Sequence, residues 1–326
     1  MRPELPVILL TTLIGAGQGL FLAVFTAQSY ALFDLVPPQQ GAAFHAPASL
    51  IALALTAAGL VASFFHLGRP ERGWRAIAQW RTSWLSREVI ALPAFMGAVF
   101  VYGLAHWFDL RPALVTLADG RVIDATVALG VLATALAFAL YVCTGMIYAC
   151  LPFLREWRSP LTVINYTLIG GASGFTLAAA FAARAAPQLL AFFTGWALVI
   201  TLLAAASRGA SLWRNRRLRP HSTVQTAIGI KHPRIEQKSK GFQAGSFNTR
   251  EFFHGRKPGT LRWVRAAFLL AGFALPAALL GVALATGSRW LPLAAFLIQF
   301  AGLLAERWYF FAEANHPQNL YYRAIA

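Results

Sequence analysis

The chain has 326 residues, of which 58% are hydrophobic and only 12% are charged, and its formal net charge is +16. Soluble domains carry about 25% charged residues, so this composition excludes an ordinary soluble globular protein. The apolar residues come in blocks of roughly 20 or more, which is the length of helix that crosses a bilayer.

Eight such blocks are predicted to be membrane-spanning helices. They occupy about 6–33, 46–67, 89–107, 125–150, 160–183, 188–206, 264–285 and 291–312. Strands of a β-barrel alternate in hydrophobicity over about 10 residues and these blocks do not, so the predicted fold is an all-α polytopic membrane protein. The first block is too long for the apolar part of a cleaved signal peptide and lacks a basic stretch before it, so we expect a retained span.

The first predicted span contains the sequence G-A-G-Q-G, with glycines at 15, 17 and 19. A dinucleotide-binding loop would need a preceding strand and a soluble βαβ unit, and neither is predicted here. Small residues four positions apart are typical of close helix contacts in membranes, so Gly15 and Gly19 are expected to face another helix. Gln18 is expected to hydrogen-bond a neighbouring helix.

Two titratable residues flank the connector between the second and third spans. His66 ends one apolar block, Glu88 begins the next, and the residues between them are rich in arginine and tryptophan. Ionisable groups at membrane depth are costly and usually functional. Histidine titrates near neutrality and a carboxylate can relay protons to water, so the pair predicts a site for a lipid-soluble redox carrier. The alternative for Glu88 is a helix cap with Ser86.

A haem is the alternative cofactor. His45 and His106 are predicted on one side of the membrane and could serve as axial ligands, although histidines at such boundaries are commonly interfacial residues, and we expect no haem. Cys143 and Cys150 lie on one predicted helix, cannot pair with each other, and are expected to be small apolar core residues. The chain has no C-x-x-C set, so no iron–sulfur cluster or zinc site is expected.

Basic residues gather in the connectors after the second, fourth and sixth spans, while the other connectors hold few. The positive-inside bias therefore predicts that these three connectors and both termini are cytoplasmic, in a bacterial inner membrane. The predicted division is 1–206 with six spans, 207–263 as a basic cytoplasmic loop, and 264–326 with two spans and a cytoplasmic tail. Within the last part, Pro276 predicts a kink, and Glu306 with Arg307 is interpreted as an interfacial ion pair.

The loop 207–263 has too few aliphatic residues to form a core of its own. It is either a solvated segment that contacts anionic lipid headgroups or a docking segment for a cytoplasmic partner. Four phenylalanines favour the second interpretation: Phe242, Phe247, Phe252 and Phe253. Nucleic acid is not an expected partner, because no nucleic-acid-binding fold is predicted.

The chain resembles the DmsC-like membrane anchors of the dimethyl sulfoxide reductase family. Three segments carry the resemblance: the H-L-G-x-P box from His66 to Pro70, the L-S-x-E box from Leu85 to Glu88, and Tyr148–Pro160, Y-A-C-L-P-F-L-R-E-W-R-S-P. The long basic insert and the ending after Glu306 look more like the anchor of a cytoplasmic sulfite-oxidising molybdoenzyme.

The resemblance implies membership of a three-part complex. A molybdopterin subunit would perform the substrate chemistry, a ferredoxin-like iron–sulfur subunit would transfer electrons, and the anchor would hold both on the cytoplasmic face and bind ubiquinone or menaquinone. The family's quinol-binding histidine and glutamate correspond to His66 and Glu88, which are also the residues that the chain itself singles out. Arg69, Trp84 and Tyr148 are the further candidates for the quinone site.

The predicted function is electron transfer between a partner's iron–sulfur cluster and the quinone pool, in the direction from sulfite to quinone. One alternative is a dimethyl sulfoxide reductase-type complex that oxidises quinol. Another is a passive anchor with no quinone site. A transporter is disfavoured, because the sequence has no inverted repeat and few charges deep in its spans.

Overall fold

The computed structural model describes residues 3–219, 223–236 and 258–314. Within these ranges, eight helical spans are long and apolar enough to cross a membrane, which confirms the predicted fold class. The spanning elements are α1 (Leu5–Leu32), η1 with α2 (Gly41–His45, Ala46–Phe64), α3 (Trp84–Trp107), α4 (Ala125–Ala149), α5 (Pro160–Ala185), η3 with α6 (Pro187–Leu189, Leu190–Arg216), α9 with η4 and α10 (Pro258–Leu269, Leu270–Ala274, Leu275–Thr286) and α11 (Leu291–Glu313).

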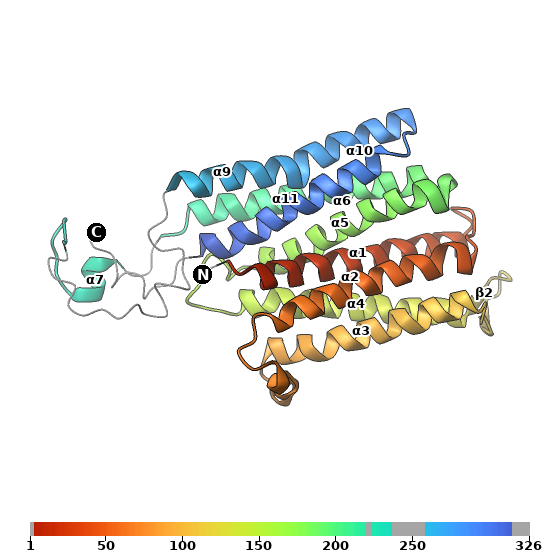
Figure 1. Cartoon of the computed structure of the whole chain (residues 1–326), viewed down its shortest axis with the longest axis horizontal. Helices are drawn as coiled ribbons and strands as arrows, with labels where there is room; N and C mark the ends of the chain where they lie inside the picture. Colours follow the sequence, from red (N-terminus) through yellow and green to blue (C-terminus); the bar gives the residue numbers. More distant parts are fainter. Residues whose placement is uncertain (1–2, 220–222, 237–257, 315–326) are drawn as a thin grey trace.

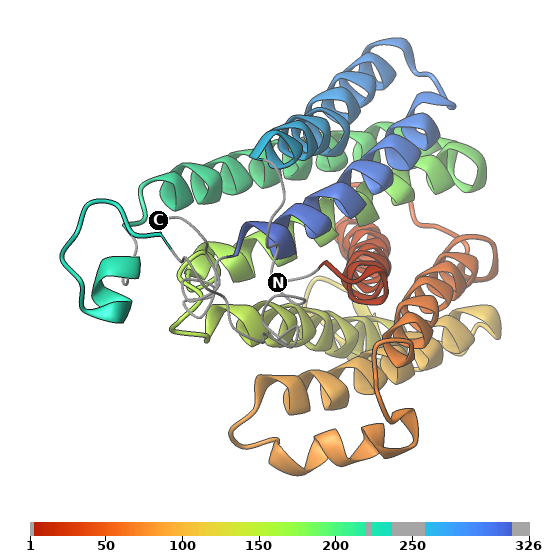
Figure 2. The ribbon, with the colours of Figure 1, turned by 60° about the vertical axis from the view of Figure 1, so that its left-hand side comes forward.

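The spans run side by side as one bundle (Figure 1). In the part of the chain that the structure describes, four shorter elements lie outside it: the 3₁₀ helix η2 (Pro70–Gln79), the antiparallel strands β1 (Ala113–Thr116) and β2 (Val122–Asp124), and α7 (Val224–Ile228). Helix η2 has no buried residue and stands out from the side of the bundle (Figure 2). The small hairpin was not predicted, because its strands are short and largely exposed.

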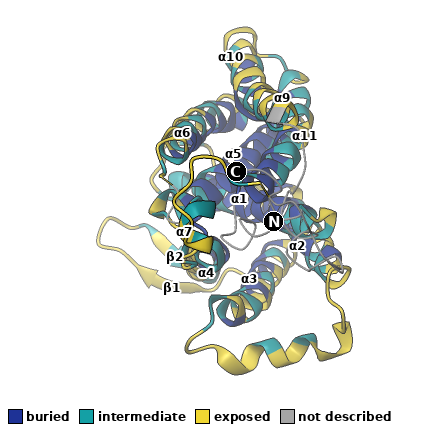
Figure 3. Cartoon of the chain, turned by 90° about the vertical axis from the view of Figure 1, so that its left-hand side faces the viewer, coloured by how far each residue is buried: buried dark blue, intermediate teal, exposed yellow. Residues whose placement is uncertain are grey.

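Helices α1 and α5 form the centre of the bundle (Figure 3). About two thirds or more of their most apolar windows are buried, 67% and 72%, whereas no other span exceeds 39%. Gly15 and Gly19 of α1 lie against Gly170 and Gly174 of α5, where an added side chain would meet the facing backbone. The predicted glycine contact is therefore confirmed.

The amide of Gln18 also behaves as predicted. Its Nε2 donates a hydrogen bond to the carbonyl oxygen of Ala137 in α4 over 2.8 Å. Tyr141 of the same helix donates to the carbonyl oxygen of Gly15 over 2.9 Å. These two bonds fix the register of α4 against the glycine face of α1.

The glycine contact gives a stability prediction. Gly174→Leu is expected to lower the melting temperature of the purified protein and its yield from membranes, because a leucine there would drive α1 and α5 apart. Gly195→Leu in α6 is the matched control, since nothing lies within 4 Å of a side chain added at that position. Equal melting temperatures for the two variants would show that the glycine contact does not hold α1 and α5 together.

Two predicted boundaries differ from the structure. Helix α3 begins at Trp84 rather than 89, with the Ser83 side chain accepting a hydrogen bond from the Ser86 amide. Ser83 is thus the cap, and Glu88 lies in the second turn. The loop expected over 207–263 also differs, because α6 continues to Arg216 and α9 begins at Pro258. The phenylalanines at 242, 247, 252 and 253 lie outside the described residues.

Two further predictions concern single residues. A π-helical turn, η4, immediately precedes the helix that contains Pro276, where a kink was expected. Cys143 and Cys150 are both free, and the first is buried as expected, but the second is exposed at the end of α4. Cys150 is therefore not a core residue, because α4 ends at Ala149, directly before it.

The connectors after α2, α4 and α6 meet at one end of the bundle, with the start of α1 and the end of α11. We name this the basic end, because these connectors and the helix turns that border them carry most of the chain's arginines. The hairpin and the connectors after α1, α5 and α10 lie at the opposite end.

Candidate functional site

A large cavity, named here the main cavity, lies at the basic end. Its volume is about 610 Å³, within the roughly 300–1,000 Å³ that is usual for small-molecule sites. It is formed where the starts of α1 and α3 meet the ends of α2, α4 and α11. The lining residues are Glu4, Val7, Leu10, Ile14, Leu60, Ser63, His66, Leu67, Gly73, Ala76, Leu85, Glu88, Val89, Leu92, Pro93, Ile147, Tyr148 and Phe311.

Three of the five predicted site residues line this cavity together: His66, Glu88 and Tyr148. Arg69 and Trp84 are not among the lining residues. Arg69 precedes η2 and is exposed, and the ring of Trp84 lies under the guanidinium of Arg87, 4.3 Å from its centroid. The structure therefore brings together the histidine, the carboxylate and the tyrosine, and leaves the other two residues apart from them.

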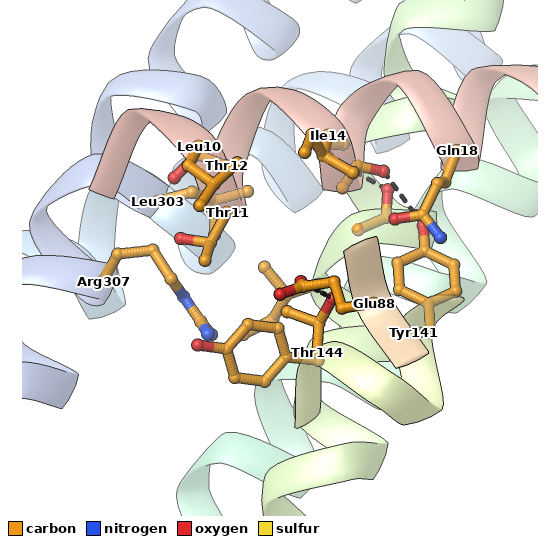
Figure 4. A pocket seen from close by; sticks show the side chains of 15 residues that line it. Leu10, Thr11, Thr12, Ile14, Gln18, Glu88, Tyr141, Thr144, Leu303 and Arg307 are labelled. Atoms are coloured by element: carbon orange, nitrogen blue, oxygen red, sulfur yellow. Dashed lines mark hydrogen bonds between the residues drawn. The ribbon is translucent and has the colours of Figure 1, made fainter. Parts of the chain in front are cut away.

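Glu88 enters the cavity wall from the second turn of α3. Thr144 of α4 donates a hydrogen bond from its hydroxyl to Glu88 Oε1 over 2.5 Å, which fixes the carboxylate (Figure 4). A capping acid would sit in the first turn of its helix, near the free amides. The interpretation of Glu88 as a cap for α3 is therefore wrong, because the helix starts earlier than predicted and its cap is Ser83.

His66 lies in the turn that follows α2 and is exposed. Ser63, in the last turn of α2, also lines the cavity. The imidazole and the carboxylate of Glu88 thus belong to different elements and border one space. The main cavity therefore has polar groups from two separate elements in its wall.

The rest of the lining is mostly apolar, and its aromatic part comes from two helices far apart in sequence. Tyr148 of α4 stacks on Tyr166 of α5, with centroids 5.7 Å apart and an interplanar angle of 8°. Its edge contacts Phe311 of α11, with centroids 5.6 Å apart. The aromatic part of the wall thus comes from α4 and α11, and no tryptophan of the connector between His66 and Glu88 is among the lining residues.

Sequence reasoning missed Glu4, Ser63 and Phe311. Ser63 could have been predicted from the sequence, because the span predicted over 46–67 contains both Ser63 and His66, and residues three apart on a helix share a face. Glu4 and Phe311 could not have been predicted, since nothing in the sequence shows that the start of α1 and the end of α11 meet beside α3.

The pair Glu306 and Arg307 differs from its prediction. Both side chains are buried, 0% and 3% exposed, and Arg307 Nε lies 2.6 Å from Glu306 Oε2. Arg208 of α6 lies 2.6 Å from the other carboxylate oxygen. The predicted ion pair is therefore present, but its interfacial position is wrong: with Arg208 the two residues form a buried ion cluster between α6 and α11, and Arg208 is part of a helix rather than the loop.

The two candidate haem ligands also differ from the expected boundary positions. His45 and His106 are buried, and their rings stack with centroids 4.4 Å apart and planes 18° apart. Axial ligands of one haem iron would point their nitrogens at the metal from its opposite faces, and stacked rings cannot do so. His45 Nδ1 instead lies 3.1 Å from the hydroxyl of Tyr102.

Comparison with known proteins places this geometry in a family. Residues 1–311 match the family described as DMSO reductase anchor subunit (DmsC). The chain belongs to this family. It is also 55% identical, over the full length of both chains, to a sulfite dehydrogenase subunit of Allochromatium vinosum.

The match to the DMSO reductase anchor family covers every residue of the main cavity, from Glu4 to Phe311. The predicted resemblance is thus confirmed over nearly the whole chain. This protein is a polytopic anchor of a DMSO reductase-family complex, homologous to the sulfite dehydrogenase subunit of Allochromatium vinosum.

Proposed function

We propose that the main cavity binds the headgroup of a quinone and that the anchor connects the quinone pool to an iron–sulfur cluster of a partner subunit. The observation that carries this proposal is the single cavity bordered by His66, Glu88 and Tyr148. The apolar majority of its lining suits the ring and the first part of a lipid tail, and the polar residues suit the two ring carbonyls. A bound quinone supplies the two-electron, two-proton redox chemistry.

The chain's own residues hold and move protons at this site. His66 donates a hydrogen bond to one carbonyl, and its imidazole exchanges a proton there. Glu88, held by Thr144, exchanges a proton at the opposite side of the ring. Tyr148 and Phe311 provide the aromatic surface against which the ring packs.

The basic end is proposed to face the cytoplasm of a bacterial inner membrane, with both termini on that side, because of the positive-inside bias of its connectors. Partner subunits would dock there, an iron–sulfur subunit next to the anchor and a molybdopterin subunit beyond it. The similarity to a protein named as part of a sulfite dehydrogenase supports electron flow from sulfite to quinone. The substrate chemistry then belongs to the partner.

A substitution that fills the main cavity tests the proposal. Leu60→Trp places an indole among the lining residues of α2. In the assembled complex, the KM for a soluble quinone analogue should rise about tenfold or more, because about 1.4 kcal/mol of lost ring packing corresponds to that factor. Activity with an artificial dye acceptor should stay at the wild-type level.

Leu297→Trp on α11 is the matched control, because its side chain is 59% exposed and outside the cavity. It should leave the KM unchanged. A passive anchor would give the opposite result, namely a wild-type quinone KM in both variants.

A further inference from the structure

Two small cavities with several polar lining groups adjoin the main cavity in series. The first, of about 20 Å³, shares Glu88, Leu10 and Ile14 with the main cavity. The second, of about 10 Å³, shares Tyr166 and Arg307 with the first. The three cavities thus form a series, in which Glu88 separates the first two and the Tyr166–Arg307 pair separates the last two.

The first small cavity is lined by groups that can hold water. Hydroxyls come from Thr11, Thr12, Tyr141, Thr144 and Ser173. Figure 4 shows Arg307 extending from α11 toward the space that Glu88 enters from the other side. A cavity of about 10–15 Å³ holds one water molecule when polar partners surround it. The first small cavity has room for one, and the second is close to that limit.

Buried polar atoms along the series call for such water. Among the described residues, none offers hydrogen-bonding geometry to Asn165 Oδ1. The hydroxyl of Tyr166 and the guanidinium of Arg307 interact with each other, and each keeps further hydrogen-bonding capacity for water. Buried groups of this kind are normally satisfied by protein or by ordered water. All three line the second small cavity, and two of them also line the first.

The second small cavity reaches the surface of the basic end. Its lining includes Glu156 and Ser159 from the connector between α4 and α5, and Arg214 and Asn215 from the last turn of α6. These four residues are partly exposed. The series therefore has an outlet at the basic end that is lined by different helices from the main cavity.

An ion cluster borders the second small cavity. Arg208 lies 2.6 Å from Glu306 and 3.8 Å from Glu313, and Arg307 lies 2.6 Å from Glu306. Two arginines thus face two carboxylates. A buried ion cluster of this kind is weak support for stability, since desolvation offsets the attraction, but it keeps polar groups and water inside an apolar bundle.

We propose that these cavities form an internal, hydrated proton path, which runs from the basic-end surface at Glu156 and Arg214, past Arg307 and Tyr166, to Glu88. This inference rests on the proposed quinone function. Reduction of a quinone by two electrons from an iron–sulfur partner takes up two protons, and the path delivers one of them to Glu88, which passes it to the ring carbonyl that it faces.

The reason for a separate path lies in the lining of the main cavity. A bound ring and tail would occupy this largely apolar space and exclude water from it. Glu88 would then lose contact with bulk water on that side. The first small cavity borders the same carboxylate and is lined by other residues, apart from Leu10 and Ile14, so a ring in the main cavity would leave it free for water.

Two conservative variants of the full complex test the path. Tyr166→Phe removes one hydroxyl and keeps the stacked ring, and Asn165→Leu keeps the volume and removes the polar lining. Each should lower quinone-coupled kcat about tenfold, less than the 100-fold or more that a positioned proton donor contributes, with the quinone KM unchanged. The solvent isotope effect in D2O should rise, because proton delivery becomes rate-limiting, while dye-coupled activity reports assembly.

Tyr309→Phe is the matched control, since Tyr309 is a buried tyrosine of α11 that lines none of the three cavities. Wild-type kcat and isotope effect in both test variants would overturn the path, as would a raised quinone KM with unchanged kcat. If His66→Ala and Leu60→Trp reduce quinone coupling in the same preparations, the quinone site stands without the path. If they do not, the proposed function itself is wrong.

Discussion

His66→Ala is expected to lower quinone-coupled turnover of the assembled complex about 100-fold or more, while dye-coupled activity stays at the wild-type level. His66 is the only histidine among the residues that line the main cavity. A positioned acid–base group contributes about 10²–10⁴-fold to a proton-transfer step. His66 is exposed in a turn after α2, so its loss should not affect packing of the bundle.

The matched control is His232→Ala, at an exposed histidine outside the spans. Turnover with a quinone analogue and with a dye should be measured for both variants in the same membranes. If the complex with His66→Ala turns over with the quinone analogue as fast as the complex with His232→Ala, then His66 has no role in the site. A parallel fall in dye-coupled activity would instead show a defect of assembly.

The spans were predictable from the sequence because their signal is local. An apolar block of about 20 residues can only satisfy its backbone in a membrane as a helix. The small-residue spacing of Gly15 and Gly19 is local in the same sense, and so is the polarity of Gln18 within an apolar block. Each of these predictions needed one segment and a general rule, and the structure confirms them.

Contacts between distant segments were not predictable. Glu306 and Arg307 look like a neighbouring pair, and only the structure shows that Arg208 reaches the same carboxylate. Arg208 was predicted to lie in a loop, because the arginines that follow it end the apolar block before the helix ends. Helix α6 in fact continues to Arg216. The stacked His45 and His106 were missed for a similar reason, since the two residues belong to different spans.

The candidate site was half predictable. His66 and Glu88 stand out because each is a titratable residue at the edge of an apolar block. The cavity that joins them is built by α1, α2, α3, α4 and α11, and its aromatic wall comes from helices that no local pattern connects. Arg69 and Trp84 lie next to lining residues in sequence but are not lining residues themselves, which their position along the chain does not reveal.

Glu88→Gln is expected to slow quinone-coupled turnover about 100-fold with little change in the quinone KM. Glutamine keeps the size of the side chain and can still accept the hydrogen bond from Thr144, so the cavity wall should hold its shape. The amide does not titrate, and the proton exchange that we assign to this position is lost. The pH profile of turnover should therefore change together with the rate.

Glu71→Gln is the matched control for Glu88→Gln, because Glu71 is an exposed acid of η2 that lies 3.9 Å from Arg72 and outside the main cavity. Its pH profile and rate should equal those of the wild type. For Glu88→Gln, the decisive measurement is quinone-coupled kcat across a pH series, with dye-coupled activity as the reference for assembly. A wild-type profile would leave Glu88 as a structural partner of Thr144, holding α3 against α4, and a raised KM at unchanged kcat would make it a binding residue that moves no proton.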